Sequence, residues 1–200
     1  MTGAYQIRAA IKACPRGSIF FPEDFSFIGG TKMVSSTLLR LCEDNTLTRV
    51  GQGIYCYPII DTRWGLGAQN PSLEEIATAI AKRDKARIVP TGSYALNKLG
   101  LSTQLQTNVV FYTDGSPRRI KIGNGRGILF KRCSEMKRFA FRSELMQLIV
   151  AAMREIGNGR INSDEIAKIS ELLKNVEQSD FIHDVALAPA WVQKILKEIR

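Results

Sequence analysis

The segment from Thr31 to Pro58 constrains the fold more than any other part of the chain. Its first half predicts a helix over about 32–44, because apolar residues repeat at i, i+4 and i+7: Val34, Leu38 and Leu41. Two short alternating runs follow, over 46–50 and 53–58, on either side of the sequence Gly-Gln-Gly. Such a tight turn requires the backbone freedom of glycine. The segment therefore predicts a helix that leads directly into a β-hairpin.

Two further helices are predicted before this segment. The first has apolar residues on one side, namely Tyr5, Ile7, Ala10 and Ile11, and is ended by the sequence Pro-Arg-Gly at 15–17. A short apolar strand or turn follows, and Pro22 then begins a second helix that ends at Gly29 and Gly30. Three helices followed by a β-hairpin is the order of a winged helix-turn-helix, whose third helix enters the DNA major groove.

Polar residues on the third helix and the hairpin are the candidate DNA-binding residues. Short side chains allow close approach to base edges or phosphates, and charged groups and amides donate hydrogen bonds to them. The candidates are Lys32, Ser35, Ser36 and Arg40 on the helix, with Arg49 and Gln52 on the hairpin. The alternative interpretation is a solvated polar face, or a module that packs against protein.

The rest of the chain predicts a mixed domain that ends in helices. Residues 61–70 lack periodicity and are interpreted as a linker. Helices are predicted over 71–90, where Ser72 and Glu75 form a capping box, and over 92–101. Strands are predicted over 106–113, 118–123 and 127–133, and helices over 143–157, 163–176 and 189–200. The prediction is an α+β fold: a winged helix-turn-helix over 1–60, then a domain over 71–200 that has a small antiparallel sheet and is helical after about 142.

Charge is unevenly distributed along the chain. The net charge of +9 divides into +2 for residues 1–60, +9 for 61–142 and −2 for 143–200. A basic segment favours an anionic partner, either nucleic acid or an acidic protein face. The candidate basic interaction surface is Arg118, Arg119, Lys121, Arg126, Lys131 and Arg132. Strand alternation places Arg119 and Lys121 on one face and Arg118 on the other. A merely solvated sheet face is the alternative.

No catalytic constellation is predicted. Gly92-Ser93 before a strand resembles the start of a nucleotidyltransferase site, but Asn108 stands where a metal carboxylate is required and Asp114 falls in a turn. The sequence Ile-Gly-Asn-Gly-Arg at 122–126 is interpreted as a hairpin turn, because it lacks the context of a phosphate loop. His183 is the only histidine. We therefore expect no enzymatic activity, no metal and no cofactor.

The sequence also indicates a cytoplasmic protein that does not enter membranes. No apolar run approaches the length of about 18 residues needed to span a bilayer. Charged residues interrupt the first fifteen positions, so the apolar block of a signal peptide is missing. The four cysteines have no C-x-x-C spacing and are interpreted as reduced thiols.

Two stretches resemble AbiEi-type antitoxins. The first is SSTLLRLCEDNTLTRVGQGIYCYP, and the second is PTGSYALNKLGLSTQLQTNVVFYTDGSPRRIKIGNGRGILFKRC. Together they place the resemblance over about residues 1–133. It implies a repressor that binds double-stranded operator DNA of its own operon, and an antitoxin against a nucleotidyltransferase toxin in a bacterial type IV (abortive infection) system. It also implies that antitoxin and toxin need not form a stable complex.

A degenerate nucleotide-handling enzyme is a further alternative, which the missing carboxylates oppose. Two other functions remain open at this point. One is a winged-helix regulator whose second half senses a small molecule, and ligand-dependent loss of operator binding would favour it. The other is a nucleic-acid-binding protein that acts on RNA through the basic middle segment.

Overall fold

The structure is a computed structural model, which describes residues 2–62, 65, 67–104, 107–123 and 125–200. The chain divides into two compact units. The first contains residues 1–80 and 120–127, and the second contains 81–119 and 128–200. The hairpin of β8 and β9 thus contributes residues to both units.

The first unit begins with helical elements and three short strands. They are α1 (Gly3–Ala13), β1 (Ile19–Phe20), the 3-10 helix η1 (Pro22–Phe25), α2 (Thr31–Glu43), β2 (Thr48–Gly51) and β3 (Ile54–Cys56). After these come β4 (Ile59–Asp61), β5 (Gly67–Gln69) and most of α3 (Leu73–Arg83). The helix predicted over 32–44 and the strands predicted on either side of the Gly-Gln-Gly turn are therefore confirmed.

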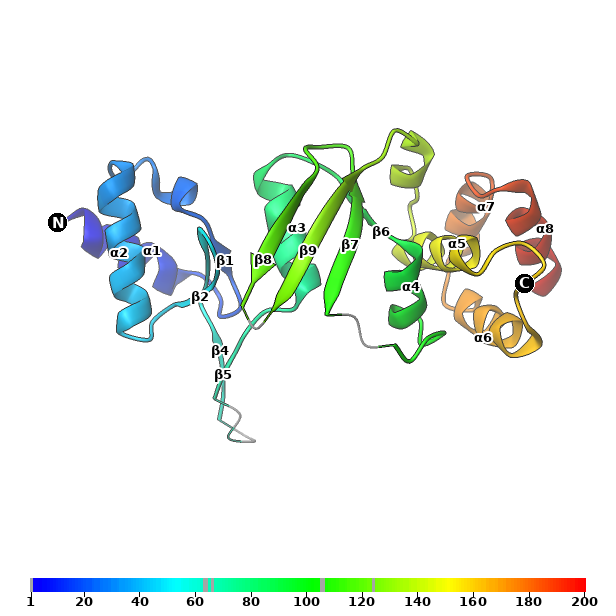
Figure 1. Ribbon diagram of the computed structural model, residues 1–200, viewed down its shortest axis with the longest axis horizontal. Coiled ribbons are helices and arrows are strands. Elements are labelled where there is room, and N and C mark those ends of the chain that lie inside the picture. The colour runs from blue at the N-terminus through cyan, green and yellow to red at the C-terminus, as the bar shows by residue number, and fades with distance from the viewer. Residues whose placement is uncertain (1, 63–64, 66, 105–106, 124) are drawn as a thin grey trace. The chain divides into compact units, whose positions relative to one another are not determined.

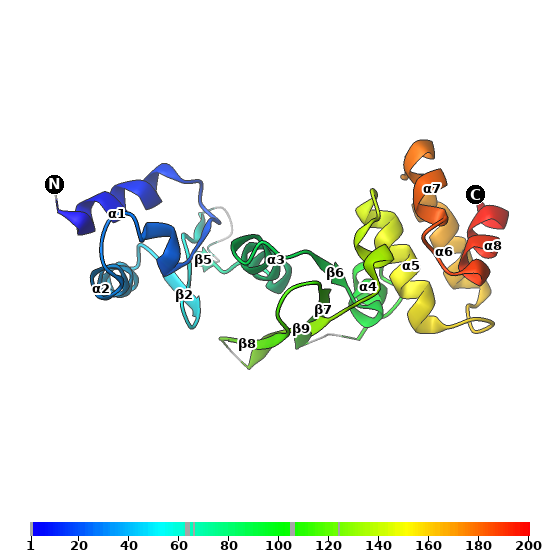
Figure 2. The same cartoon turned by 90° about the horizontal axis from the view of Figure 1, so that it is seen from above.

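A small apolar core holds α1, η1 and α2 together. Ile7 and Ile11 of α1 and Leu38 of α2 are fully buried, and Phe20 and Phe25 pack against them. The two ring centroids are 5.7 Å apart at a tilt of 37°, a favourable aromatic arrangement. Figures 1 and 2 both show α1 lying against α2. This packing fixes which side of α2 faces solvent.

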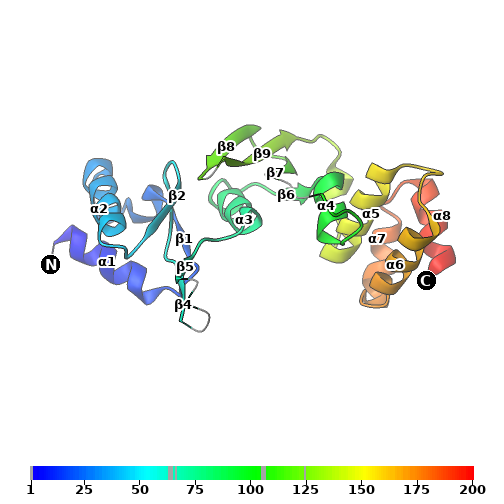
Figure 3. The same cartoon turned by 60° about the horizontal axis from the view of Figure 1, so that its bottom comes forward.

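The strands of the first unit form a small antiparallel set. Strand β3 pairs with β1 on one side and with β2 on the other, with Arg49 opposite Tyr55. Gly51 at the end of β2 also pairs with Ile122 at the end of β8. Strands β4 and β5 form a separate pair, visible in Figure 3. Part of the segment interpreted as a linker is therefore paired strand, while residues 63, 64 and 66 lie outside the described residues.

The second predicted helix is wrong in its length. Only Pro22–Phe25 is helical, as a single 3-10 turn. Asp24 closes that turn by accepting a hydrogen bond from the backbone of Phe21 at 2.8 Å. Phe25 is buried in the core, and the glycines that follow disfavour further helix. The start signals were correct, but they supported one turn only.

The second unit combines strands with a helical bundle. Its strands are β6 (Ile88–Pro90), β7 (Asn108–Thr113), the first two residues of β8 (Arg118–Ile122) and most of β9 (Arg126–Arg132), with neighbours in the order β8-β9-β7-β6. Its helical elements are α4 (Gly92–Lys98), η2 (Met136–Phe139), α5 (Glu144–Ile156), α6 (Ser163–Leu173), α7 (Gln178–Val185) and α8 (Ala190–Ile199).

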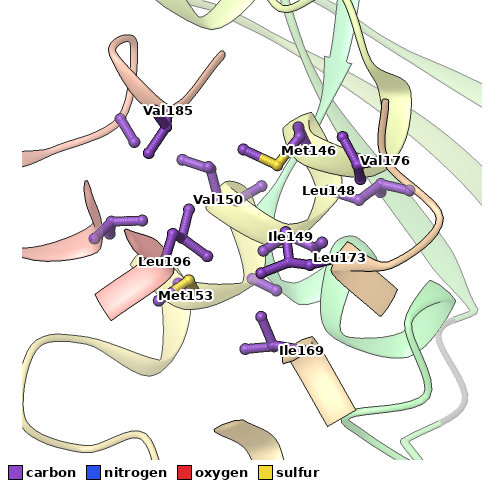
Figure 4. Packing of buried hydrophobic residues seen from close by; sticks show 14 of the residues in the cluster. Met146, Leu148, Ile149, Val150, Met153, Ile169, Leu173, Val176, Val185 and Leu196 are labelled. Atoms are coloured by element: carbon purple, nitrogen blue, oxygen red, sulfur yellow. The ribbon is translucent and has the colours of Figure 1, made fainter. Parts of the chain in front are cut away.

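Helix α5 is the centre of the second unit's core. It contacts α4, α6, α7 and α8, and Met146, Ile149 and Met153 are completely buried. Figure 4 shows Ile149 beside Leu173 of α6 and Met153 beside Leu196 of α8, within the same apolar cluster. The apolar run of α5 is therefore explained by contacts on several sides.

One buried carboxylate fixes the start of α5. Asp184 of α7 has no exposed surface, and its oxygens accept hydrogen bonds from the backbone amides of Arg142 (2.9 Å) and Ser143 (2.8 Å). His183 Nδ1 lies 2.8 Å from the same carboxylate. Ser143 in turn caps α5 by accepting from the amide of Met146. Helix α7 is thus tied to α5 through polar contacts as well as apolar ones.

Three elements of the second unit are missing from the sequence prediction: β6, η2 and α7. The helix predicted over 71–90 ends at Arg83, and Lys85 takes a positive φ of 53° before β6 begins. Strand β6 pairs antiparallel with β7, with Val89 opposite Tyr112. Helix α7 has no side-chain cap, so the local signal for it is weak.

The α+β class and the helical end of the chain are confirmed. The expected division into 1–60, 61–70 and 71–200 is sequential, whereas the compact units interleave at the β8–β9 hairpin. Which segments fold independently stays a prediction. Of the helices in the described part of the chain, none is both long and apolar enough to reach across a bilayer.

Candidate nucleic-acid interface

The solvent face of α2 is built from the residues left over by its buried stripe. Val34, Leu38 and Leu41 point into the core, so Lys32, Ser36 and Arg40 are exposed. Within the described residues, no side-chain hydrogen bond or ion pair engages Lys32 or Arg40. Two cationic groups about two helical turns apart therefore remain available to an anionic partner.

The two candidate serines differ in their surroundings. Ser36 is exposed, and its hydroxyl donates to the carbonyl oxygen of Met33 at 3.0 Å. The lone pairs of the Ser36 hydroxyl oxygen remain available as acceptors. Ser35 is half-buried. Of the pair, Ser36 is the better placed to meet a partner on the solvent face.

Leu39 is a member of this face that the sequence pattern did not indicate. Its side chain is 42% exposed, although it is a leucine in the middle of α2. It lies one turn after Ser36 and beside Arg40. An exposed apolar group among polar ones is suited to contact the methyl group of thymine in the major groove. Its position outside the i, i+4, i+7 stripe is the signal that could have identified it.

The hairpin of β2 and β3 carries the remaining two candidates. Arg49 is exposed opposite Tyr55, and Gln52 is exposed in the turn between the strands. Gly53 has a φ of 66°, which favours glycine and allows the tight turn. Val50, between the two candidates, is buried and anchors the strand. The turn thus presents polar groups on a fixed hairpin.

Acidic groups at the end of α2 reduce the positive charge only in part. Asp44 forms an ion pair with Arg8 of α1 and accepts from the amide of Thr46 at 3.0 Å. The hydrogen bond from Thr46, helped by Arg8, holds the pKa of the Asp44 carboxyl below its usual value. Asp44 is therefore balanced by Arg8 rather than by Arg40. Glu43 is exposed at the end of the helix.

The candidate basic interaction surface divides between the units. Lys121 and Arg126 belong to the first unit, and Arg118, Arg119, Lys131 and Arg132 belong to the second. Burial along β8 alternates as predicted, with Arg119 and Lys121 exposed. Lys131 and Arg132 at the end of β9 are exposed as well.

Arg118 is engaged inside the second unit. Its guanidinium forms an ion pair with Asp84, which is also bound by Arg83 at 2.9 Å, and lies 5.8 Å from the ring centroid of Phe130. Burial lowers the pKa of the Arg118 guanidinium. Its side chain is 33% exposed, so it contributes less to the surface than its neighbour Arg119. The two adjacent arginines therefore differ: Arg118 is held in an ion pair, whereas Arg119 is exposed.

The residues of the nucleotidyltransferase-like stretch have packing roles. A Cβ atom at Gly92 would lie 2.4 Å from Cβ of Glu155 and 2.8 Å from the carbonyl oxygen of Ala151, so glycine is required where α4 meets α5. Asp114 accepts from the amide and Nε of Arg87, at 2.7 and 2.8 Å. Asn108 is exposed at the start of β7, and Asn124 of the predicted turn lies outside the described residues.

Metal ligands do not gather in the described part of the chain, where no three His, Cys, Asp or Glu side chains could hold one ion. The four cysteines, all of which the structure describes, carry free thiols. The absence of enzymatic activity stays a prediction.

Comparison with known families places the chain in one of them. Residues 6–181 match DUF6088, which is described as a family of unknown function. The chain belongs to this family. No curated protein matches the sequence. Among solved structures, the chain is similar to the RV2827C protein from Mycobacterium tuberculosis, with 13% identity and a TM-score of 0.47. That similarity covers 98% of this chain and 81% of the other.

Membership of the DUF6088 family assigns no activity. A functional proposal therefore depends on the solvent face of α2 and on the β2–β3 hairpin.

Proposed function

We propose that the chain is a DNA-binding transcriptional regulator whose first unit acts as a winged helix-turn-helix. The element order α1, β1, η1, α2, β2, β3, with β1 and β2 on either side of β3, supports this proposal. In such modules a recognition helix enters the major groove while a hairpin contacts the backbone. Helix α2 takes the first role and the β2–β3 hairpin takes the second.

The observation that carries the proposal is the solvent face of α2. Lys32 and Arg40 are exposed without an ion-pair partner among the described residues, and Ser36 and Leu39 lie between them. This combination offers charge for phosphates, a hydroxyl for base edges and an apolar group for a thymine methyl.

We further propose that the regulator is an antitoxin that represses its own operon and counteracts a nucleotidyltransferase toxin. The resemblance of two stretches to AbiEi-type antitoxins supports this role. The exposed cations Arg119, Lys131 and Arg132 of the second unit suit an acidic face of the toxin, or competition for its nucleic-acid substrate. We expect the protein to work in the cytoplasm.

Operator binding should depend on the face of α2. We expect Arg40→Ala and Ser36→Glu each to weaken binding to the DNA upstream of the chain's own gene by about 1.5 kcal/mol, roughly tenfold in Kd, through the loss of one contact. Electrophoretic shifts at fixed salt measure this, and circular dichroism checks the fold. The matched control is Lys12→Ala, which removes an exposed charge from α1. If the wild type and all three variants bind this DNA with equal affinity, α2 is not the recognition helix.

Antitoxicity should be separable from operator binding. We expect the neighbouring gene to encode a nucleotidyltransferase whose expression arrests growth, and this chain to relieve the arrest. Arg40→Ala should still protect cells, whereas changing Arg119, Lys131 and Arg132 together to Glu should abolish protection while DNA binding stays within a few-fold of the wild type. Protection lost in Arg40→Ala would mean that both tasks share one surface. Full protection by the folded triple variant would mean that these cations only solubilise the sheet.

A further inference from the structure

A cavity of about 170 Å³ lies within the first unit. Its lining comes from β2, from the residues that precede α3, from α3 itself and from the end of the β8–β9 hairpin. Val50, Ile76 and Ile122 supply buried apolar walls, and Arg49, Asn70 and Arg126 supply polar groups. Strand β2 and the β8–β9 hairpin each contribute one arginine to this concave site, and the segment around the start of α3 completes its wall.

The charge of this cavity is positive. Of the described residues that line it, none is acidic. Glu75 of the adjoining helix is engaged in the capping box of α3, where it accepts from the amide of Ser72 at 2.7 Å and from its hydroxyl at 2.8 Å. Two guanidinium groups beside an apolar wall favour an anion, because their attraction is less screened there than in open water.

Arg126 has an unmet hydrogen-bonding requirement. Its Nε is buried and has no acceptor among the described residues. A buried donor without a partner costs free energy, and the cost is larger for a charged group. A ligand oxygen in the cavity would supply the acceptor. Arginine is well suited to this, since its planar fork matches the oxygens of phosphate.

The size of the cavity limits the ligand. Cavities for drug-sized molecules or cofactors are typically about 300–1,000 Å³, so a volume near 170 Å³ accommodates a phosphate group but not a bulky ligand. We propose that this cavity is a phosphate-binding site formed by Arg49 and Arg126, which receives either a free phosphate compound or a phosphate of the nucleic-acid backbone. The proposal does not rest on operator binding, because free phosphate tests it alone.

Inorganic phosphate is the probe. Isothermal titration of the full chain, at an ionic strength held constant with chloride, should show saturable binding of phosphate at millimolar concentrations. We expect Arg126→Gln and Arg49→Gln each to weaken it about tenfold through loss of a charge-assisted hydrogen bond. The matched control is Arg160→Gln, which removes an exposed arginine between α5 and α6 and should change phosphate affinity less than about twofold. Should one pocket variant fail to fold by circular dichroism, the other still decides.

The two sources of phosphate are distinguished with DNA. If the backbone is the source, phosphate competes with DNA, and Arg126→Gln lowers the slope of log K against log salt by about one. If a free compound is the source, the DNA slope is unchanged in Arg126→Gln. Either result is compatible with the site. The proposal is overturned if wild-type protein shows no saturable phosphate binding, or if both folded pocket variants bind phosphate as tightly as the wild type.

Discussion

Asp184→Ala should lower the free energy of unfolding by about 4 kcal/mol, because it removes a fully buried carboxylate and leaves the two backbone amides that it binds without their acceptor. These are the amides of Arg142 and Ser143 at the start of α5, the helix around which the second unit's core is packed. Each unsatisfied buried donor costs about 1–3 kcal/mol. Urea denaturation followed by circular dichroism measures the change.

Two variants serve as controls for this prediction. His183→Ala removes the neighbouring ring but keeps the carboxylate, and should cost about 1 kcal/mol or less. Asp184→Asn keeps one acceptor oxygen but turns a donor toward the second amide, so its cost should be intermediate. If Asp184→Ala and His183→Ala cost the same, the carboxylate is not the group that holds the start of α5.

Arg118→Glu should cost about 3 kcal/mol, whereas Arg119→Glu should cost about 0.5 kcal/mol or less. The two positions are adjacent on β8 and the substitution is identical. Arg118 is paired with Asp84 and has a buried Nε, so glutamate there breaks an ion pair and faces a like charge. Arg119 is exposed. The same denaturation experiment on both variants measures the difference.

Equal costs at the two positions would contradict the burial pattern of β8. This comparison also guides the antitoxicity experiment. A variant with glutamate at Arg118 would lose stability. If it failed to protect cells, that failure would not show whether the basic interaction surface is required.

Local patterns predicted α2 and the β2–β3 hairpin because the signals for them lie within a few residues. The apolar stripe of Val34, Leu38 and Leu41 can be recognised within a single helix. Gly51 and Gly53 identify the turn that follows. Alternation along β8 also predicted that Arg119 and Lys121 share one face of the strand, and both are exposed in the structure. These features depend on backbone geometry alone, so a single sequence is enough to find them.

Features that depend on distant partners were missed. Strand β6 is only three residues long and is defined by its pairing with β7, more than fifteen residues away. The role of Asp184 depends on amides 41 and 42 residues earlier in the chain. The partner of Arg118 is separated from it by 34 residues. No local signal contains such information, since charged residues are ordinarily expected at the surface.

The central claim is that the solvent face of α2 meets DNA bases. Its most direct test is a photo-reactive amino acid placed at position 36, and, in a second variant, at position 12 of α1. With DNA from upstream of the chain's own gene, we expect cross-links to bases from position 36 and none from position 12. A protein that binds this DNA without cross-linking from position 36, or that does not bind it at all, would show that α2 is not the recognition helix.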